Sequence, residues 1–255
     1  MDFISGEIIA VDKPLGWTSF DAVKRIRGAI QRRLHVRKFK VGHAGTLDPL
    51  ATGVLIVCTG RATRRIEELQ NGDKEYVATI RLGATTPSYD LETAIDREYP
   101  WDHITREMVE DAIPAFTGKI MQVPPVFSAV KVEGKRAYDL ARKGKEVSLK
   151  AKPLEIREME LLEFTPPEIR VRIVCSKGTY IRAIARDLGE ALGTGAHLTA
   201  LRRTRVGAID HASCLTIDQA VERIASCELT YPDDYRLSDQ TQSCKTTPGD
   251  ISPEN

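Results

Sequence analysis

The segment that most constrains this chain is residues 41–53, VGHAGTLDPLATG. It holds three glycines and one proline, and its single acidic residue, Asp48, directly precedes Pro49. Glycine adopts backbone conformations that other residues avoid, and Asp-Pro is typical of turns. We therefore expect a loop here and not the interior of a helix or strand. Taken alone, the segment favours a structural role for Asp48 in a turn or at a helix N-terminus, although glycine-rich loops also carry functional residues.

Apolar residues at intervals of three and four predict an amphipathic helix over residues 19–34, with Thr18 or Ser19 as its N-cap. The predicted apolar face of this helix consists of Phe20, Val23, Ile26, Ile30 and Leu34. Similar patterns predict helices at 61–70, 104–116, 136–143, 180–192 and 216–224, and strands at 7–11, 54–58, 76–82 and 168–175. Because helices and strands alternate irregularly, the expected fold class is α+β.

The composition of the chain changes after Ser226. Residues 227–255 are rich in Ser, Thr, Asp and Pro and lack a periodic apolar pattern. Such a segment cannot bury enough apolar surface to offset the cost of ordering it, so we predict a disordered polar tail. The preceding residues are numerous enough to form a substantial core. The sequence therefore predicts one folded domain, residues 1–226, followed by the tail.

The chain shows no sign of a membrane segment, because no apolar run approaches the ~18 residues that a spanning helix needs. The N-terminus, MDFISGEIIAVDKP, is acidic, and its apolar part is too short for a signal peptide. The five cysteines have neither CxxC spacing nor a spacing with histidine that is typical of metal sites. We therefore expect a cytoplasmic protein without a bound metal.

Basic residues are unevenly distributed, although the whole chain has a net charge of only +1. Residues 24–40 contain eight Lys and Arg residues and no acidic residue, and residues 127–152 contain eight against three acidic ones. A third basic cluster consists of Arg202, Arg203 and Arg205. One basic face could be a solvated surface, but three separate clusters favour a polyanionic partner such as a nucleic acid. Charge alone does not distinguish DNA from RNA.

Six segments, in order, resemble the TruB family of tRNA pseudouridine synthases. They are VDKPLGWTS (11–19), VGHAGTLDPLATGVL (41–55), KEYVATIRLGATTPSYD (74–90), VPPVFSAVKVEGKRAYDLARKG (123–144), CSKGTYIRAIARDLGEALGTGAHLTALRRTRVG (175–207) and LTIDQA (215–220). The resemblance covers residues 7 to about 224. The combination of GTLDPLATG, KGTYIR and LRRT in this order is specific to the family.

The resemblance implies a pseudouridine synthase fold, in which a mixed, mostly antiparallel sheet is flanked by helices and loops around an RNA-binding cleft. It also implies an isomerase that flips a uridine out of tRNA, expected to be uridine-55 in the TΨC loop, and converts it to pseudouridine. Because this reaction neither adds nor removes atoms, no cofactor or metal is expected, and the sequence contains no GxxxxGK[ST] phosphate-binding loop. The expected partner is the T-arm stem-loop of tRNA, bound by a monomer away from any membrane.

Asp48 matches the family's catalytic aspartate by its position in the motif. A carboxylate can act as a nucleophile and divide one difficult step into two. The sequence leaves open whether Asp48 attacks ribose C1′, attacks the base or removes a ribose proton. Arg182 resembles the arginine that pairs with this aspartate and keeps it ionised. Tyr76 resembles the tyrosine that stacks on the target base and is proposed to act in proton transfer from C5, although alone it would be interpreted as a core residue.

Five further residues match positions at the family's site and are expected to bind substrate. They are His43, Asp90, Tyr180, Leu201 and Lys13. The resemblance assigns His43 to the space that flipped nucleotides leave, Asp90 to a contact with the nucleotide, and Leu201 to an apolar wall of the base pocket. Tyr180 fits a core role as well as a contact with substrate. Lys13 matches a lysine near the site.

Residues 123–152 correspond to a family insertion that folds against the RNA stem-loop. The polar tail lacks the apolar strands of the C-terminal PUA or PUA-like domain that many bacterial relatives have, so we expect that domain to be absent. Two alternatives remain. A non-catalytic RNA-binding protein on the same fold could lose Asp48 or Arg182, which are both present. A hydrolase with a carboxylate pair would need a second acid near Asp48, for which Asp90 is the candidate.

Overall fold

The computed structural model describes residues 1–128, 130–132, 135–138 and 148–232. The main sheet contains β1 (Ile8–Lys13), β2 (Val41–His43), β3 (Ala51–Thr59), β4 (Lys74–Leu82), β7 (Gly118–Gln122), β10 (Lys152–Thr165), β11 (Glu168–Cys175), β12 (Ala196–Val206), β13 (Ile209–Asp210) and β14 (Leu215–Thr216). Two small hairpins are formed by β5 (Ala84–Thr85) with β6 (Arg97–Glu98) and by β8 (Lys131–Val132) with β9 (Lys135–Arg136).

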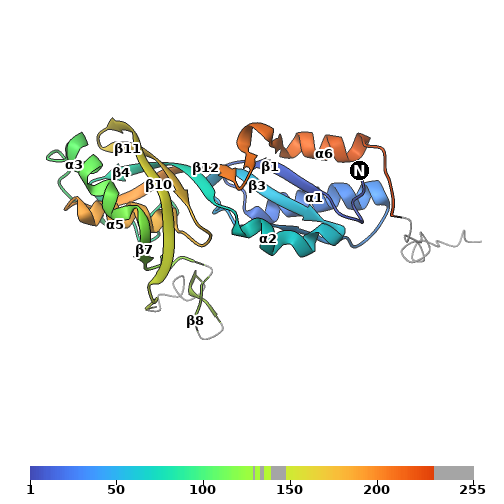
Figure 1. Cartoon of the computed structure of the whole chain (residues 1–255), viewed down its shortest axis with the longest axis horizontal. Helices are drawn as coiled ribbons and strands as arrows, with labels where there is room; N and C mark the ends of the chain where they lie inside the picture. The colour runs from blue at the N-terminus through green and yellow to red at the C-terminus, as the bar shows by residue number, and fades with distance from the viewer. Residues whose placement is uncertain (129, 133–134, 139–147, 233–255) are drawn as a thin grey trace, which may run out of the picture.

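The helices cover the two ends of this sheet. The α helices are α1 (Ser19–Leu34), α2 (Ile66–Asn71), α3 (Arg106–Ala112), α5 (Ile181–Ala191) and α6 (Ile217–Ser226), and the short 3₁₀ helices are η1 (Gly60–Arg65), η2 (Ile113–Phe116) and η3 (His211–Ser213). In Figure 1 the main sheet runs along an elongated molecule, with α1, α2 and α6 at one end and α3 and α5 at the other.

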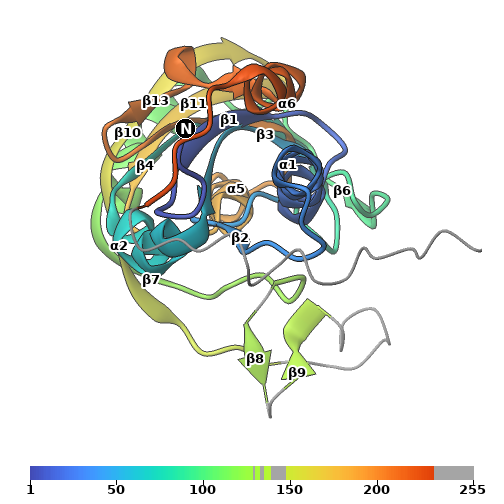
Figure 2. The same cartoon turned by 90° about the vertical axis from the view of Figure 1, so that its right-hand side faces the viewer.

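The main sheet has the strand order β14-β1-β3-β12-β4-β11-β10-β7, with β2 paired to β3 and β13 paired to β12. The pairs β1–β14 and β3–β12 are parallel, and the other pairs are antiparallel. The fold class is therefore α+β with a mostly antiparallel sheet, which confirms the prediction. The small hairpin of β8 and β9 lies apart from this sheet (Figure 2).

Helix α1 begins and ends where the sequence predicts. The Thr18 hydroxyl accepts from the Asp21 amide and the Asp21 carboxylate accepts from the Thr18 amide, so the two form a capping box. Phe20, however, is 59% exposed, and its predicted place on the apolar face is wrong. Its position in the first turn points outward because the adjacent Ser19 faces the interior, and the guanidinium of Arg27 lies 5.6 Å from the Phe20 ring centroid.

Three apolar clusters hold the sheet and helices together. The first joins α3 and α5 to β4, β10, β11 and β12, and the second joins α1 and α6 to β1 and β3. Strand β3 is buried on both faces, because Leu55 and Val57 enter the second cluster while Val54, Ile56 and Cys58 enter a third. This burial explains why β3 has a continuous apolar sequence and not an alternating one.

Several predicted boundaries change in the structure. The segment 41–53 is a loop only between β2 and β3, because its ends pair as strands. The predicted helix at 61–70 begins as the 3₁₀ helix η1 and continues as α2, and that at 104–116 divides into α3 and η2, with Thr105 as the cap. Strands β7, β10 and β12 were not predicted. Most of the predicted helix at 136–143 lies outside the described residues.

The chain beyond α6 first runs beside the N-terminus. The Met1 amino group donates to the Glu228 carbonyl over 2.6 Å, and the Thr230 amide donates to the Met1 carbonyl over 3.2 Å. Leu229 packs against the second apolar cluster. The rest of the predicted tail, residues 233–255, lies outside the described residues, as do parts of the predicted insertion, residues 129, 133–134 and 139–147.

Candidate functional site

The loop between β2 and β3 places Asp48 against the first turn of α5. The Nε atom of Arg182, on α5, lies 2.9 Å from Oδ2 of Asp48. The side chain of Arg182 is 6% exposed, whereas that of Asp48 is 41% exposed. The two predicted catalytic residues are therefore in contact, with a buried cation behind a carboxylate that remains accessible.

Two backbone carbonyls and a second carboxylate surround the guanidinium of Arg182. Its Nη1 donates to the Ser88 carbonyl over 3.1 Å and its Nη2 to the Phe127 carbonyl over 2.9 Å. Its Nε also lies 3.6 Å from Oδ2 of Asp90, whose side chain is 8% exposed. The other oxygen of Asp90 accepts from the Glu92 amide over 3.0 Å. A guanidinium held on several sides cannot rotate freely, so its Nε stays directed at Asp48.

The environment changes the acidity of Asp48. Although 41% of the Asp48 side chain is exposed, the protein packed around it separates its carboxyl from bulk water. This burial raises the pKa of Asp48 above its usual value of 3.8, the positive charge of Arg182 opposes that rise, and the negative charge of Asp90 adds to it. Burial disfavours the charged form of a carboxylate, and a carboxylate that is poorly solvated and still ionised is a stronger base and nucleophile. Arg182 is thus the group that keeps this form populated.

Lys13 is a buried residue that supports the backbone of the Asp48 loop. It is the last residue of β1 and is 0% exposed, and its Nζ donates to the carbonyls of Pro14, Trp17 and Pro49. Burial lowers the pKa of Lys13 to about 8, with the charge of Asp48 opposing the change. The expectation that Lys13 contacts substrate does not fit this position, because its side chain reaches the backbone of the loop and not the pocket.

Ser19 and Arg203 are two further supports of the loop that the sequence did not reveal. The Ser19 hydroxyl accepts from the Leu47 amide over 2.8 Å and donates to the Leu47 carbonyl over 3.1 Å. Arg203, on β12 and 1% exposed, donates to the carbonyls of Gly45, Thr46 and Val54. Together with Lys13, these side chains satisfy the buried carbonyls that hold the loop in place.

The structure divides the third predicted basic cluster, because Arg203 is buried whereas Arg202 and Arg205 stay partly exposed. Arg203 is buried, Arg202 pairs with Asp12 over 2.7 Å, and Arg205 lies 3.6 Å from Glu75. The prediction fails for Arg203, because alternate residues of a strand face opposite sides and Arg203 faces the interior while Arg202 does not. A register shift between Arg203 and Arg205 separates the surroundings of those two residues. Because β12 contains three arginines close together, its hydropathy pattern does not indicate that Arg203 is buried.

Tyr76 and Tyr180 are close enough to Asp48 to interact with it electrostatically. Tyr76, on β4, is 9% exposed and belongs to the first apolar cluster. Burial raises the pKa of Tyr76, Arg203 opposes this, and the charge of Asp48 adds to it, which places the ring in the electrostatic field of both groups. Tyr180 is the N-cap residue of α5, and its amide and carbonyl both bond to the side chain of Gln122.

Leu201 and Asp90 line a narrow pocket beside Asp48, together with Arg182 and the exposed Leu91. Its free volume is about 20 Å³, room for a water molecule but not for a pyrimidine. Entry of a base therefore requires side chains at its mouth to move. His43 ends β2, half-buried, at the start of the Asp48 loop, and burial lowers its pKa, which favours a neutral imidazole.

The sequence matches two profiles of known protein families. Residues 31–181 match the N-terminal domain of TruB family pseudouridylate synthases, and residues 182–237 match the C-terminal domain of tRNA pseudouridylate synthase B. The boundary between the two matches falls between Ile181 and Arg182, within α5. This chain belongs to the TruB family. The tRNA pseudouridine synthase B of Phocaeicola vulgatus is 63% identical over 229 residues, which cover 90% of this chain and 97% of that protein.

Solved structures with related sequences share the fold of this chain. A Cbf5-Nop10-Gar1 complex contains a chain that is 30% identical, with a TM-score of 0.65 and coverage of 87% of this chain and 55% of that one. An H/ACA RNP bound to a substrate RNA containing 2′-deoxyuridine contains one that is 28% identical, with a TM-score of 0.60 and coverage of 84% and 52%. The present chain thus spans about half of each of those chains. Among the described residues, no helix has the length and apolar character to cross a lipid bilayer.

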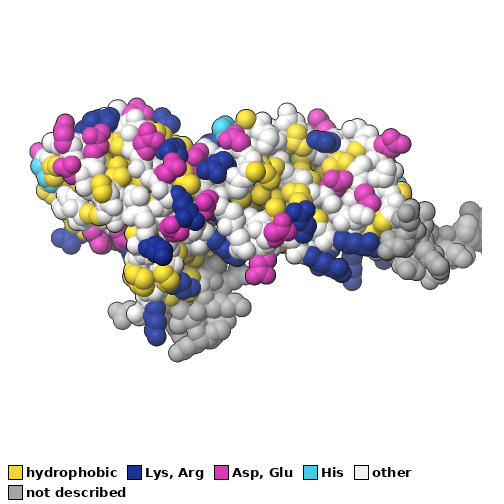
Figure 3. All heavy atoms as spheres, in the orientation of Figure 1, with side chains coloured by type: hydrophobic (Ala, Val, Ile, Leu, Met, Phe, Trp, Pro, Cys, Tyr) yellow, Lys and Arg dark blue, Asp and Glu magenta, His cyan; other side chains and the backbone are white. Residues whose placement is uncertain are grey.

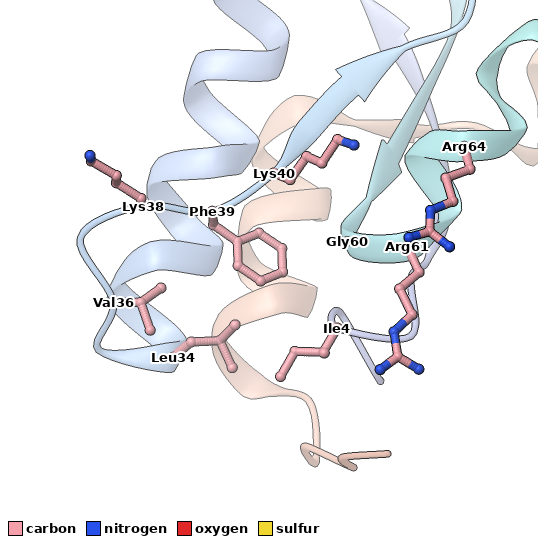
Figure 4. A pocket seen from close by; sticks show the side chains of 9 residues that line it. All are labelled: Ile4, Leu34, Val36, Lys38, Phe39, Lys40, Gly60, Arg61 and Arg64. Carbon is pink, nitrogen blue, oxygen red and sulfur yellow. The ribbon is translucent and has the colours of Figure 1, made fainter. Parts of the chain in front are cut away.

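A second concave surface of this TruB-family chain lies at the other end of α1. It is a pocket of about 400 Å³ whose apolar part includes Ile4, Leu34 and Phe39. Figure 4 shows the Phe39 ring between α1 and η1, with the side chains of Arg61 and Arg64 on the opposite wall. Lys38 and Lys40 complete the basic rim of this pocket. On the face shown in Figure 3, Lys and Arg side chains gather along the lower edge of the right-hand half of the molecule.

Proposed function

We propose that this enzyme isomerises uridine-55 in the T-arm of tRNA to pseudouridine, with Asp48 as the nucleophile. The observation that carries the proposal is the 2.9 Å contact between Asp48 and a buried, rigidly held Arg182 at the mouth of a pocket. The relative from Phocaeicola vulgatus is named for the same reaction class and matches nearly the whole chain. We further propose that the enzyme acts as a monomer in the cytoplasm.

The proposed reaction exchanges one glycosidic bond for another. The Asp48 carboxylate displaces N1 of uracil at ribose C1′, the detached base rotates, and C5 then displaces the carboxylate. The proton lost from C5 balances the proton gained at N1, so no atoms enter or leave. Arg182 keeps Asp48 ionised before the attack and stabilises it again as the leaving group. Tyr76 stacks on the base in this proposal and takes part in the transfer of the C5 proton.

The target base must leave the stacked tRNA loop before it reaches Asp48. Extrusion costs a few kcal/mol, roughly, and is offset by contacts in the pocket. Because the pocket is too small for a base, we propose that Leu91, a lining residue that is 55% exposed, moves as the base enters. We assign Leu201 and Asp90 to the walls of the enlarged pocket, and His43 to the gap that the flipped nucleotides leave.

The phosphates of tRNA have a basic surface to bind. Residues 24–40 carry eight basic residues and no acidic one, and Lys38 and Lys40 from this segment join Arg64 at the rim of the pocket in Figure 4. A surface of this kind binds a polyanion without reading its sequence. We propose that it holds the tRNA while the Asp48 pocket selects the uridine.

A non-catalytic RNA-binding protein on the same fold is the second candidate. It would use the same basic surface, but it would not need a carboxylate held by a buried arginine. A buried guanidinium whose Nε is directed at a partly exposed carboxylate beside a pocket has a use in the proposed reaction and none in binding alone, so the arrangement around Arg182 favours the catalytic proposal.

A transcript of tRNA labelled with tritium at uracil C5 tests the proposal. The wild-type enzyme is expected to release tritium to water, and mapping of the product should place pseudouridine at position 55. A transcript with cytidine at position 55 is the matched control and should release none above background. No release from the first transcript would contradict the proposed activity, and equal release from both would contradict the proposed position.

A further inference from the structure

Helix α5 carries two arginines one turn apart that reach the same two segments of the chain. Arg182 donates to the carbonyls of Ser88 and Phe127, as described above. Arg186 donates from Nη2 to the Val123 carbonyl over 3.1 Å, and its guanidinium carbon lies 5.1 Å from the centroid of the Tyr89 ring. The segments 88–89 and 123–127 are thus each tied to α5 twice.

Arg186 is itself held in place. Its side chain is 15% exposed, and its Nε donates to the Asp187 carboxylate over 2.6 Å. A cation over the face of an aromatic ring is attracted by the ring quadrupole, and the attraction grows as water is excluded. The contact with Tyr89 is therefore a fixed one and not a chance approach of two surface side chains.

Tyr89 has a backbone conformation that residues other than glycine rarely adopt. Its φ is +60°, in the left-handed region. Hydrogen bonds hold it there, because its amide donates to the Thr86 carbonyl and its carbonyl accepts from the Leu198 amide, each over 3.0 Å. Strained residues of this kind persist only where their surroundings enforce them, and they cluster at functional sites.

The strain at Tyr89 has a direct geometric consequence for Arg182. The φ angle of residue 89 turns the peptide plane that contains the Ser88 carbonyl, and that carbonyl is one of the two acceptors that orient the Arg182 guanidinium. A Tyr89 that relaxed to negative φ would turn the Ser88 carbonyl away. The Arg186–Tyr89 contact holds the side chain of this residue, and together with the two backbone hydrogen bonds of Tyr89 it keeps the Ser88 carbonyl directed at Arg182.

We propose that Tyr89 and Arg186 are a positioning pair that holds Arg182 in line with Asp48 without touching the substrate. The proposal rests on the proposed function, since it gives the pair a role in the reaction that Asp48 performs. It adds two residues to the site that neither charge nor hydropathy would select. A small displacement of a group that positions the reacting atoms can cost up to about 100-fold in rate.

The test compares Tyr89→Ala and Arg186→Met with Tyr89→Phe, which keeps the ring face and loses only the hydroxyl that bonds to Arg186. Arg106→Met is the matched control, because Arg106 is an exposed arginine on α3 that pairs with Glu110. We expect the single-turnover rate of tritium release at saturating enzyme to fall about 10-fold or more in the first two variants, and to stay within about twofold in the other two. Affinity for tRNA should be unchanged in all four.

A second readout distinguishes positioning from a general structural role. Arg182 lowers the pKa of Asp48, so loosening Arg182 should raise that pKa and shift the acid limb of the rate profile to higher pH. Titration of the Asp48 carboxyl by carbon NMR should show the same upward shift. Arg186→Lys keeps the charge but loses the planar guanidinium, and it replaces Arg186→Met in the test if that variant does not fold. The rate of Arg186→Lys should also fall.

The outcomes separate this inference from the proposed function. Wild-type rates in Tyr89→Ala and Arg186→Lys would overturn the positioning pair, and so would a slower rate without any change in the Asp48 titration. If the wild type itself released no tritium, the proposed function would fail. The NMR titration would still test whether the pair controls the environment of Asp48.

Discussion

The Nε atom of Arg182 lies 2.9 Å from Oδ2 of Asp48, and the guanidinium that contains it is also bonded to two backbone carbonyls. The same Nε lies 3.6 Å from Asp90, which is almost fully buried. The shorter of the two contacts is therefore with Asp48, the more exposed of the two carboxylates. In this arrangement the positive charge of Arg182 favours the ionised form of Asp48, and the fixed guanidinium holds the carboxylate in one orientation. The negative charge of Asp90 balances part of the buried positive charge of Arg182.

Arg182→Lys tests whether the geometry of the cation matters beyond its charge. An ammonium group cannot bond at once to Asp48, Ser88 and Phe127 with the planar fork of a guanidinium. The single-turnover rate of tritium release should fall about 100-fold or more, as when one preorganised donor is removed. Arg106→Lys, on the surface of α3, provides the control. A rate near that of the wild type would show that charge alone is sufficient.

The pH dependence of the rate should reflect the raised pKa of Asp48. In the proposed reaction the carboxylate is the reactive form, so the rate should decline as the pH falls through this raised pKa, which lies above the usual 3.8. Asp90→Asn removes a negative charge that raises the pKa of Asp48, so its acid limb should lie at lower pH than that of the wild type. Single-turnover rates from about pH 4 to pH 8 would show the limb. An acid limb at the same or a higher pH in Asp90→Asn would contradict the conclusion that the charge of Asp90 raises the pKa of Asp48.

Arg202 and Arg203 are adjacent in sequence but should differ in their effect on stability. Arg203→Met leaves the carbonyls of Gly45, Thr46 and Val54 without their donor, and should lower the free energy of unfolding by about 3 kcal/mol. Arg202→Met removes one partly exposed ion pair with Asp12 and should cost less than about 1 kcal/mol. Urea unfolding measures both. Equal effects would mean that burial of Arg203 does not support the loop.

The basic rim near α1 should contribute to tRNA affinity but not to chemistry. Charge reversal of Lys38, Lys40 and Arg64 should weaken tRNA binding and reduce the slope of its dependence on salt by up to about one for each phosphate that is no longer bound. The rate at saturating enzyme should be unchanged, because these residues line a different pocket from Asp48. Reversal of Arg106 and Arg170, which are exposed elsewhere, is the control. An unaffected salt slope would show that this rim is only solvated.

Much of the fold was predictable because its signals are local. The boundaries of α1 and β11 follow from apolar spacing and strand alternation, and the place of α6 from the apolar spacing at 216–224. Strand β10 was missed because most of its residues are exposed, and shifts of register near Glu158 and Glu163 interrupt its alternation. Strand β12 was missed because its arginines were interpreted as a surface charge cluster.

The candidate site shows a similar division. Asp48 and Arg182 came from motifs, since no periodicity links residues so far apart in the chain. The support of the Asp48 loop by Lys13, Ser19 and Arg203 was not predictable, because it consists of side chains bonded to backbone carbonyls. Such bonds depend on the tertiary structure and leave no pattern in the sequence. The Tyr89–Arg186 contact belongs to the same class, because it joins two segments only after folding.

The central claim, that the reaction depends on the Asp48 carboxylate, is tested most directly by Asp48→Asn. This variant keeps the size of the side chain and removes its charge. With tRNA labelled at uracil C5, we predict tritium release by the wild type and none by Asp48→Asn above background, while both bind tRNA with similar affinity. Release by Asp48→Asn at the wild-type rate would contradict the account.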